Sequence, residues 1–240
     1  MVRDYVVFDL ETTGLSPARN EIIEIGALKV RDGRVSDRFS ELVKPFSPVP
    51  DAVAHLTGIS NEMLENARPA REVVPDFVRF CGDDILVGHN LMFDFSFTKK
   101  TAGELGLTFE HQGIDTLKIS RRVLTDLPSR SLGALCDHYG IVNSSAHRAY
   151  HDALATARVY QTLAHYYEAK APEVFVPREL HWKAPKSRPM TKKQKDYLKV
   201  LCKYHRIEFN ESMEEMTMSQ ASRLIDKIIL THGRMAFSQE

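Results

Sequence analysis

Two acidic side chains directly follow an apolar run near the start of the chain. Residues 5–8 are β-branched or aromatic, which predicts a buried strand, and Asp9 and Glu11 come at its end. Because side chains alternate along a strand, both carboxylates point to the same side, where they repel one another. A divalent cation is the simplest charge to place between them, since hard cations bind carboxylate oxygens. The alternative is a strand that ends in a solvated acidic loop, so a metal site requires further ligands from elsewhere in the chain.

Two more acids lie at the starts of predicted helices. Asp94 falls in the first turn of a helix predicted over residues 91–105, and Asp152 near the start of one predicted over 149–170. Acids are common at helix N-termini because the helix dipole favours them, so each also has a purely structural explanation. His147 precedes Asp152 by five residues, and an imidazole placed beside bound metal ions can take a proton from water.

Three segments together resemble the exonuclease motifs of a known superfamily. They are residues 8–14 (FDLETTG), residues 89–94 (HNLMFD), and His147 followed five residues later by Asp152. Their order and spacing are similar to those of the DEDD superfamily, and the histidine spacing resembles its DEDDh branch. That branch includes the proofreading epsilon subunit of bacterial DNA polymerase III, and the resemblance covers about residues 4–168. It implies a ribonuclease H-like fold.

The resemblance also implies a role for each acid. Asp9, Glu11, Asp94 and Asp152 would hold two metal ions, with Asp9 bridging them, and His147 would be the general base. Two divalent cations about 4 Å apart can activate a water and stabilise the leaving oxygen of a phosphodiester. Mg²⁺ is the expected ion and Mn²⁺ the substitute, because both prefer oxygen ligands.

Five further residues match family positions that contact the terminal nucleotide. By that matching the substrate-binding residues are Thr12, Leu15, His55, Asn90 and Phe93, with Phe93 stacking on a base or sugar. Structural alternatives exist for three of them: Leu15 and Phe93 suit a hydrophobic core, and Asn90 suits a helix cap.

The elements that must position these side chains follow from hydrophobic periodicity. Strands are predicted over 5–8, 22–30, 34–43, 84–90 and 114–116, and helices over 60–64, 73–81, 91–105 and 149–170. Two further helices are predicted, one that follows the strand at 114–116 and ends at 124, and one that begins at about 131. Asp32-Gly33 marks a hairpin turn. The pattern predicts an α/β fold in which a three-strand antiparallel meander is joined by parallel strands and flanked by helices. Asp115 recurs in the family and is interpreted as structural support.

Composition changes after the long helix. Residues 172–190 mix prolines with basic side chains, and two helices are predicted beyond them, over 192–204 and 218–231, each opening with a capping box. This divides the chain into an exonuclease domain (1–171), a linker (172–190) and a small helical hairpin (191–240). Residues 178–206 hold ten basic and two acidic side chains. The C-terminal part is therefore expected to contact nucleic acid, a DNA polymerase or a second copy of the chain.

The whole-chain totals describe an ordinary globular protein. Its 240 residues have zero net charge and are 43% hydrophobic. The three cysteines are far apart in the sequence, which favours buried free thiols in a reducing compartment. No signal peptide and no membrane-spanning run is recognised, so the expected location is the cytoplasm and no membrane partner is expected.

These observations predict a metal-dependent 3′→5′ exonuclease that removes nucleoside monophosphates from single-stranded 3′ ends of DNA, of the proofreading or repair type. The polarity comes from the resemblance alone. Two alternatives stay open: a 3′→5′ exoribonuclease with the same site, and a non-catalytic adaptor that binds nucleic acid or a polymerase. The choice between DNA and RNA depends on the shape of the pocket around the 2′ position of the sugar.

Overall fold

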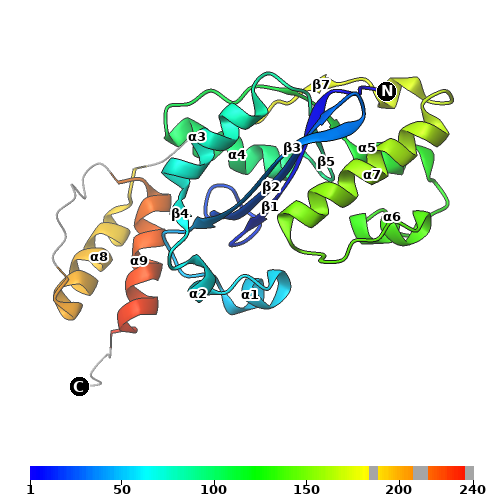
Figure 1. The fold of residues 1–240 in the computed structure, drawn as a ribbon. Helices are drawn as coiled ribbons and strands as arrows, with labels where there is room; N and C mark the ends of the chain where they lie inside the picture. The colour runs from blue at the N-terminus through cyan, green and yellow to red at the C-terminus, as the bar shows by residue number, and fades with distance from the viewer. Residues whose placement is uncertain (184–188, 208–215, 236–240) are drawn as a thin grey trace.

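A computed structural model describes residues 1–183, 189–207 and 216–235 (Figure 1). Its seven-stranded sheet has the order β4-β3-β2-β1-β5-β6-β7. The strands are β1 Tyr5–Thr12, β2 Ile22–Arg31, β3 Arg34–Lys44, β4 Arg68–Pro69, β5 Leu86–Gly88, β6 Gln112–Asp115 and β7 Arg178–Glu179. The helices are α1 Asp51–Thr57, α2 Asn61–Leu64, α3 Ala70–Cys81, α4 Met92–Glu104, α5 Thr116–Val123, α6 Leu132–Tyr139, α7 Ala149–Tyr167, α8 Lys192–His205 and α9 Met218–His232, with a short 3₁₀ turn at Pro172–Val174.

The sheet confirms the predicted mixed α/β architecture. Strands β1, β2 and β3 form an antiparallel meander, and β5 and β6 continue the sheet parallel to β1. The predicted turn between β2 and β3 is also present. Asp32 and Gly33 both have positive φ, at 49° and 75°, which is the conformation of a tight two-residue hairpin.

Strand β1 lies at the centre of the fold and is covered on both faces. Val6, Phe8 and Leu10 pack in one apolar cluster with residues of α3 and α4. Tyr5 and Val7 point the other way, into a second cluster formed largely by α5, α6 and α7. Because side chains alternate, Asp9 and Glu11 continue the α7-facing row of Tyr5 and Val7.

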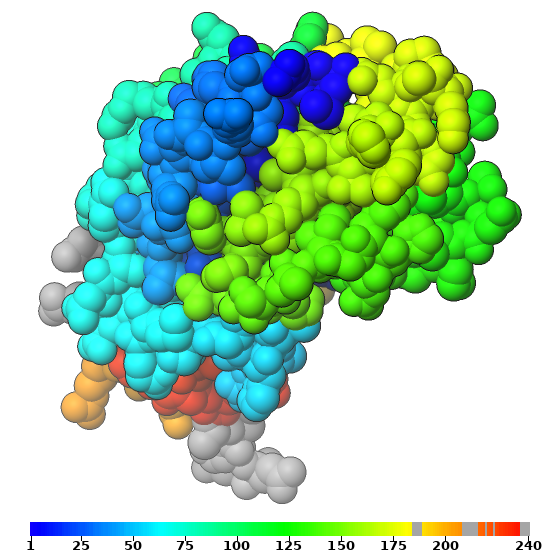
Figure 2. Space-filling model, turned by 45° about the vertical axis from the view of Figure 1, so that its right-hand side comes forward, coloured from blue at the N-terminus to red at the C-terminus, as the bar shows by residue number. Residues whose placement is uncertain are grey.

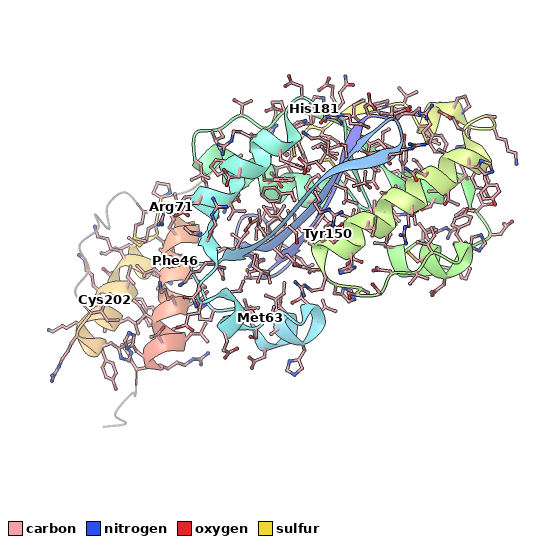
Figure 3. The ribbon with its side chains drawn as sticks, in the orientation of Figure 1. Phe46, Met63, Arg71, Tyr150, His181 and Cys202 are labelled. Carbon is pink, nitrogen blue, oxygen red and sulfur yellow. The ribbon has the colours of Figure 1, made fainter. Side chains whose placement is uncertain are left out.

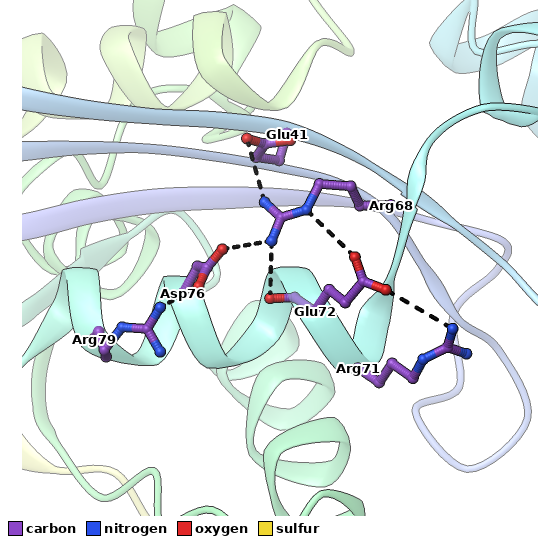
Figure 4. Close-up of polar contacts among 6 residues, drawn as sticks. All are labelled: Glu41, Arg68, Arg71, Glu72, Asp76 and Arg79. Carbon is purple, nitrogen blue, oxygen red and sulfur yellow. Dashed lines mark hydrogen bonds and ion pairs between the residues drawn. The ribbon is translucent and has the colours of Figure 1, made fainter.

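An ion-pair network fastens α3 to the sheet edge at β4 (Figure 4). Arg68 of β4 lies 2.7 Å from Asp76, 3.7 Å from Glu72 and 3.9 Å from Glu41. Arg79 also pairs with Asp76, and Arg71 with Glu72. In this Arg68 network each basic side chain on the outer surface of α3 has an acidic partner.

The segment predicted as a linker is partly built into the sheet. Strand β7 pairs antiparallel with β6, and Leu180 N donates to His111 O at 2.9 Å. Phe175 and Leu180 are buried in the two main clusters. The apolar residues of this segment are scattered among prolines and charged residues without a regular period, so sequence reasoning missed this edge strand. Residues 184–188 of the linker lie outside the described residues.

The C-terminal helices form the predicted hairpin. Leu198, Leu201 and Cys202 of α8 pack on Ile228 of α9. Both predicted capping boxes are present, at Thr191 and Thr217. Figure 1 shows α9 between α8 and the body of the molecule.

One cation–π contact fastens the hairpin to the body. Lys227 of α9 places its Nζ 3.9 Å from the centroid of the Phe46 ring, in the loop after β3 (Figure 3).

Cys81, Cys136 and Cys202 are free and buried, as predicted. Among the described residues, no helix combines the length and the apolar character needed to cross a bilayer.

Candidate active site

The short length of β5 opens the space in which the acids meet. Strand β5 pairs with β1 through Val6 and Val7, and β1 continues beyond it. The edge of β1 is then free to meet α4, and Leu10 N donates to Asp94 Oδ1 at 3.0 Å. This bond ties the buried Asp94 carboxylate to the backbone between Asp9 and Glu11.

A close backbone approach brings the start of α7 to the same place. Gly26 of β2 faces Asp9 in the strand register, and a Cβ built on it would lie 2.0 Å from Tyr150 N. Only glycine leaves room for the first turn of α7 to rest on β2. Figure 3 shows Tyr150 at this end of α7, over the sheet. The packing carries Asp152 toward the carboxylates of β1.

Both oxygens of Asp152 are held by the segment before α7. His147 N donates to Oδ2 at 2.8 Å, and Asn143 Nδ2 donates to Oδ1 at 2.6 Å. His147 has φ 63°, an uncommon conformation for a residue with a side chain. Ligand atoms of Glu11, His147 and Asp152 lie within 4.8 Å of one another. The structure thus brings together Glu11, His147 and Asp152, and the bond to Leu10 N places Asp94 beside the same stretch of β1. Asp9 lies near enough to feel the charges of all three other acids.

The electrostatics of this cluster are those of crowded, desolvated carboxylates. Burial raises the pKa of Asp9 far above its usual range, and the charges of Asp94, Asp152 and Glu11 raise it further. Burial, followed by the charge of Asp152, raises the pKa of Glu11 to about 8. The pKa values of Asp94 and Asp152 are also raised, in each case mainly by burial. In the described parts of the chain, none of the four forms an ion pair with a lysine or arginine.

Sequence reasoning also missed Glu24 and Arg148, which lie beside this cluster. Glu24 of β2 is 2% exposed and faces Glu11 in the register. It accepts hydrogen bonds from Arg148 Nη2 at 2.8 Å, from Arg148 Nε at 3.2 Å, and from Ala149 N at 2.9 Å. The available signal was an acid inside the apolar run 22–30, since a buried charge requires a partner. That the partner would be Arg148, 124 residues away, has no local signature.

The predicted substrate-binding residues differ in their exposure. Leu15 is 86% exposed, so it is not the core residue that its type allowed. His55 is exposed on α1, where its Nδ1 lies 2.7 Å from Asp51 O. Figures 1 and 2 both show α1 beside the segment that leads into α7. Thr12 is buried, and its hydroxyl donates to Gly14 O at 2.7 Å.

Asn90 lies just before α4, and Phe93 lies in its first turn. Asn90 is exposed with φ 65°, and its side chain does not cap the helix, whose N-cap position is Leu91. Its backbone N donates to Asp115 Oδ1 at 3.0 Å, and Asp115 also caps α5, which confirms its structural role. Phe93 is half-buried, with its ring 5.0 Å from that of Phe97.

Comparison with known proteins assigns the chain to a family. The sequence model of one protein family, described as Exonuclease, matches residues 6–160. The chain belongs to the exonuclease family. Among its relatives, the DNA polymerase III subunit epsilon of Aquifex aeolicus is 37% identical over 157 residues, covering 65% of this chain and 78% of that protein. The PolC-type DNA polymerase III of Caldanaerobacter subterraneus is 42% identical over 157 residues, but the match spans only 11% of that protein.

Solved structures of nucleases share the fold of this chain. Exonuclease X, in complex with 5′ overhanging duplex DNA, superposes with a TM-score of 0.57 at 24% identity, covering 71% of this chain and 96% of that one. E. coli exonuclease I, in complex with a dT13 oligonucleotide, gives 0.63 at 19% identity, covering 72% and 43%. These structures match the ribonuclease H-like architecture predicted from the sequence.

Proposed function

We propose that this member of the exonuclease family is a metal-dependent 3′→5′ exonuclease that removes nucleoside monophosphates from 3′ ends of DNA. The observation that carries the proposal is the convergence of four carboxylates from three separate parts of the chain, beside an exposed imidazole. Carboxylates whose pKa values are raised by burial and by one another require an external counter-charge to ionise together.

The donor set fits hard divalent cations. Asp9, Glu11, Asp94 and Asp152 offer oxygen ligands only, which suits Mg²⁺, with Mn²⁺ as the substitute. We assign two cations to the site, because four carboxylates balance a charge of +4. Bound there, they would supply an activated water and stabilise charge on the leaving 3′ oxygen.

The chain itself supplies the proton acceptor. His147 is exposed, and its backbone is fixed through the bond to Asp152 Oδ2. The imidazole is thereby held at the edge of the carboxylate cluster yet remains open to solvent and substrate. We assign it the role of general base, which takes a proton from the attacking water.

The terminal nucleotide is assigned to the surface around Thr12, Leu15, His55, Asn90 and Phe93. An 86% exposed leucine beside the acids provides an apolar contact for a base or sugar, and so does the half-buried ring of Phe93. The named relatives are components of DNA polymerase III, which favours DNA as the substrate and proofreading or repair as the setting.

Matched DNA and RNA oligonucleotides, each labelled at its 5′ end, test this proposal directly. With Mg²⁺, the DNA should shorten stepwise from its 3′ end and release nucleoside monophosphates, and EDTA should stop the reaction until Mn²⁺ or Mg²⁺ is added in excess. Faster shortening of the RNA would reassign the enzyme as an exoribonuclease. Intact oligonucleotides in both metals, with binding retained, would instead identify a non-catalytic adaptor.

A further inference from the structure

We propose that the outer face of α8 binds the phosphate backbone of the single-stranded DNA whose 3′ end lies in the active site. The proposal rests on the proposed function, and it adds to that function a second contact on the C-terminal hairpin. It follows from which side of α8 is buried, which charges lie on the opposite side, and how the hairpin is attached to the body.

The buried side of α8 fixes the direction of the other side. Leu198, Leu201 and Cys202 are buried against α9, at helical positions that share one face. Helix α9 in turn lies between α8 and the exonuclease domain (Figure 1). The opposite face of α8 therefore points away from the molecule.

That outward face carries a row of lysines, here called the lysine stripe. Lys192, Lys199 and Lys203 are exposed and spaced i, i+7 and i+11, which aligns them along the helix over about 16 Å. A flexible ammonium group suits the phosphates of a moving strand, because it acts as a point charge without a fixed geometry. Neutralising phosphates is the main source of affinity for nucleic acids.

Exposed aromatic and apolar side chains lie next to the lysine stripe. Tyr197, Val200 and Tyr204 are 36%, 55% and 50% exposed, and their spacing places them along the neighbouring side of the helix. Aromatic rings beside a basic track are the arrangement that stacks the bases of a single strand while its backbone is held by charge. A duplex keeps its bases stacked internally, so exposed aromatic rings beside the lysine stripe favour a single strand.

The charges of α8 differ from those of an ordinary solvated helix. On α3, the basic side chains of the Arg68 network are each matched by an acid (Figure 4). Helix α8 has five lysines and one acid, Asp196, and in the described residues the lysine stripe forms no ion pair. An unneutralised row of this kind suits a polyanionic partner. Four glutamates occur between residues 208 and 215, a stretch that lies outside the described residues.

The decisive variant replaces Lys192, Lys199 and Lys203 together with glutamine in the full-length protein. Binding of a fluorescent oligodeoxynucleotide of about 30 residues is measured in EDTA, where no hydrolysis occurs, over a series of salt concentrations. We expect affinity to fall about tenfold to a hundredfold at 0.1 M salt, and the slope of log K against log salt to become shallower by about 2, at roughly 0.7 per phosphate contact.

A matched control removes the same number of positive charges elsewhere. Arg34→Gln, Arg38→Gln and Lys170→Gln lie on β3 and just after α7, and all three side chains are exposed. This triple variant should bind the oligonucleotide like the unmodified protein. Equal losses in both triple variants would show a general effect of net charge, and unchanged binding in the α8 variant would show that these lysines do not contact the strand; either result overturns the proposal.

A one-nucleotide substrate separates this proposal from the proposed function. The p-nitrophenyl ester of thymidine 5′-monophosphate reaches only the active site, so the α8 variant should hydrolyse it at the unmodified rate with Mn²⁺. If the unmodified protein hydrolyses neither this ester nor DNA, the nuclease assignment fails, whatever the binding data show. If it hydrolyses both, and the α8 variant holds the long strand as tightly as the control does, only the α8 contact is wrong.

Discussion

Glu11 and Glu24 face each other on neighbouring strands, yet their surroundings differ in one decisive respect. Glu24 is matched by the guanidinium of Arg148 and by a backbone N–H of α7. Glu11 lies instead among other carboxylates, and its pKa is raised to about 8. The chain thus supplies a cation for the acid that fastens α7 to the sheet and leaves the other acids unmatched. That contrast is our reason for proposing that the acidic cluster binds cations from solution.

The largest expected effect comes from removing one unmatched carboxylate. Asp9→Asn keeps the size and shape of the side chain but removes a charge from the centre of the cluster. We expect hydrolysis of DNA to fall by several orders of magnitude, while thermal unfolding shows a protein at least as stable, because a repelled, desolvated charge is gone. Rates from single-turnover assays provide the measurement, and a near-normal rate would remove Asp9 from the mechanism.

Removing the imidazole should have the next largest effect. His147→Ala should lower the rate by about 10²–10⁴-fold, the usual contribution of a general base, with little change in stability because the side chain is exposed. The backbone bond from residue 147 to Asp152 stays in place. If the rate of the variant matched that of the unmodified protein, another group would have to accept the proton.

Breaking the matched pair should affect stability. Arg148→Met leaves Glu24 buried without its cation, and we expect the free energy of unfolding in urea to fall by about 2–3 kcal/mol, below the range for a fully buried pair because Arg148 is partly exposed. The double variant with Glu24→Gln should recover part of that loss. A double variant that unfolds as easily as Arg148→Met alone would show that the Glu24 charge is not the cause.

The unmatched acids should make stability depend on pH in the metal-free protein. Glu11 has a folded pKa raised from 4.5 to about 8, so folding favours its protonated form. The stabilisation is therefore complete below about pH 4.5 and disappears as pH rises toward 8. Unfolding midpoints in EDTA should fall across that window, and less steeply in Glu11→Gln. An identical pH profile in the two proteins would contradict the assignment.

Local patterns in the sequence were enough to predict most of the fold. Alternation placed Asp9 and Glu11 on one side of β1, and the capping boxes at Thr191 and Thr217 marked the starts of α8 and α9. Helix α1 was missed because Pro50 precedes it and no side chain caps its first turn.

The candidate site was predictable only in part. Spacing alone left Asp94 and Asp152 as ordinary acids of helix starts, and family resemblance was needed to group them with Asp9. The pairing of Glu24 with Arg148 joins residues 124 positions apart, and Asn143 contacts Asp152 from an irregular loop. Such contacts depend on how α7 packs on the sheet, which no short sequence pattern specifies.

Mn²⁺ binding, followed by electron paramagnetic resonance of the free ion, shows whether the unmatched acids hold two cations. We expect two bound ions per unmodified chain, a loss of that binding in Asp9→Asn, and retention in Glu24→Gln. Binding that is absent from the unmodified chain, or that disappears with Glu24 but survives without Asp9, would contradict it.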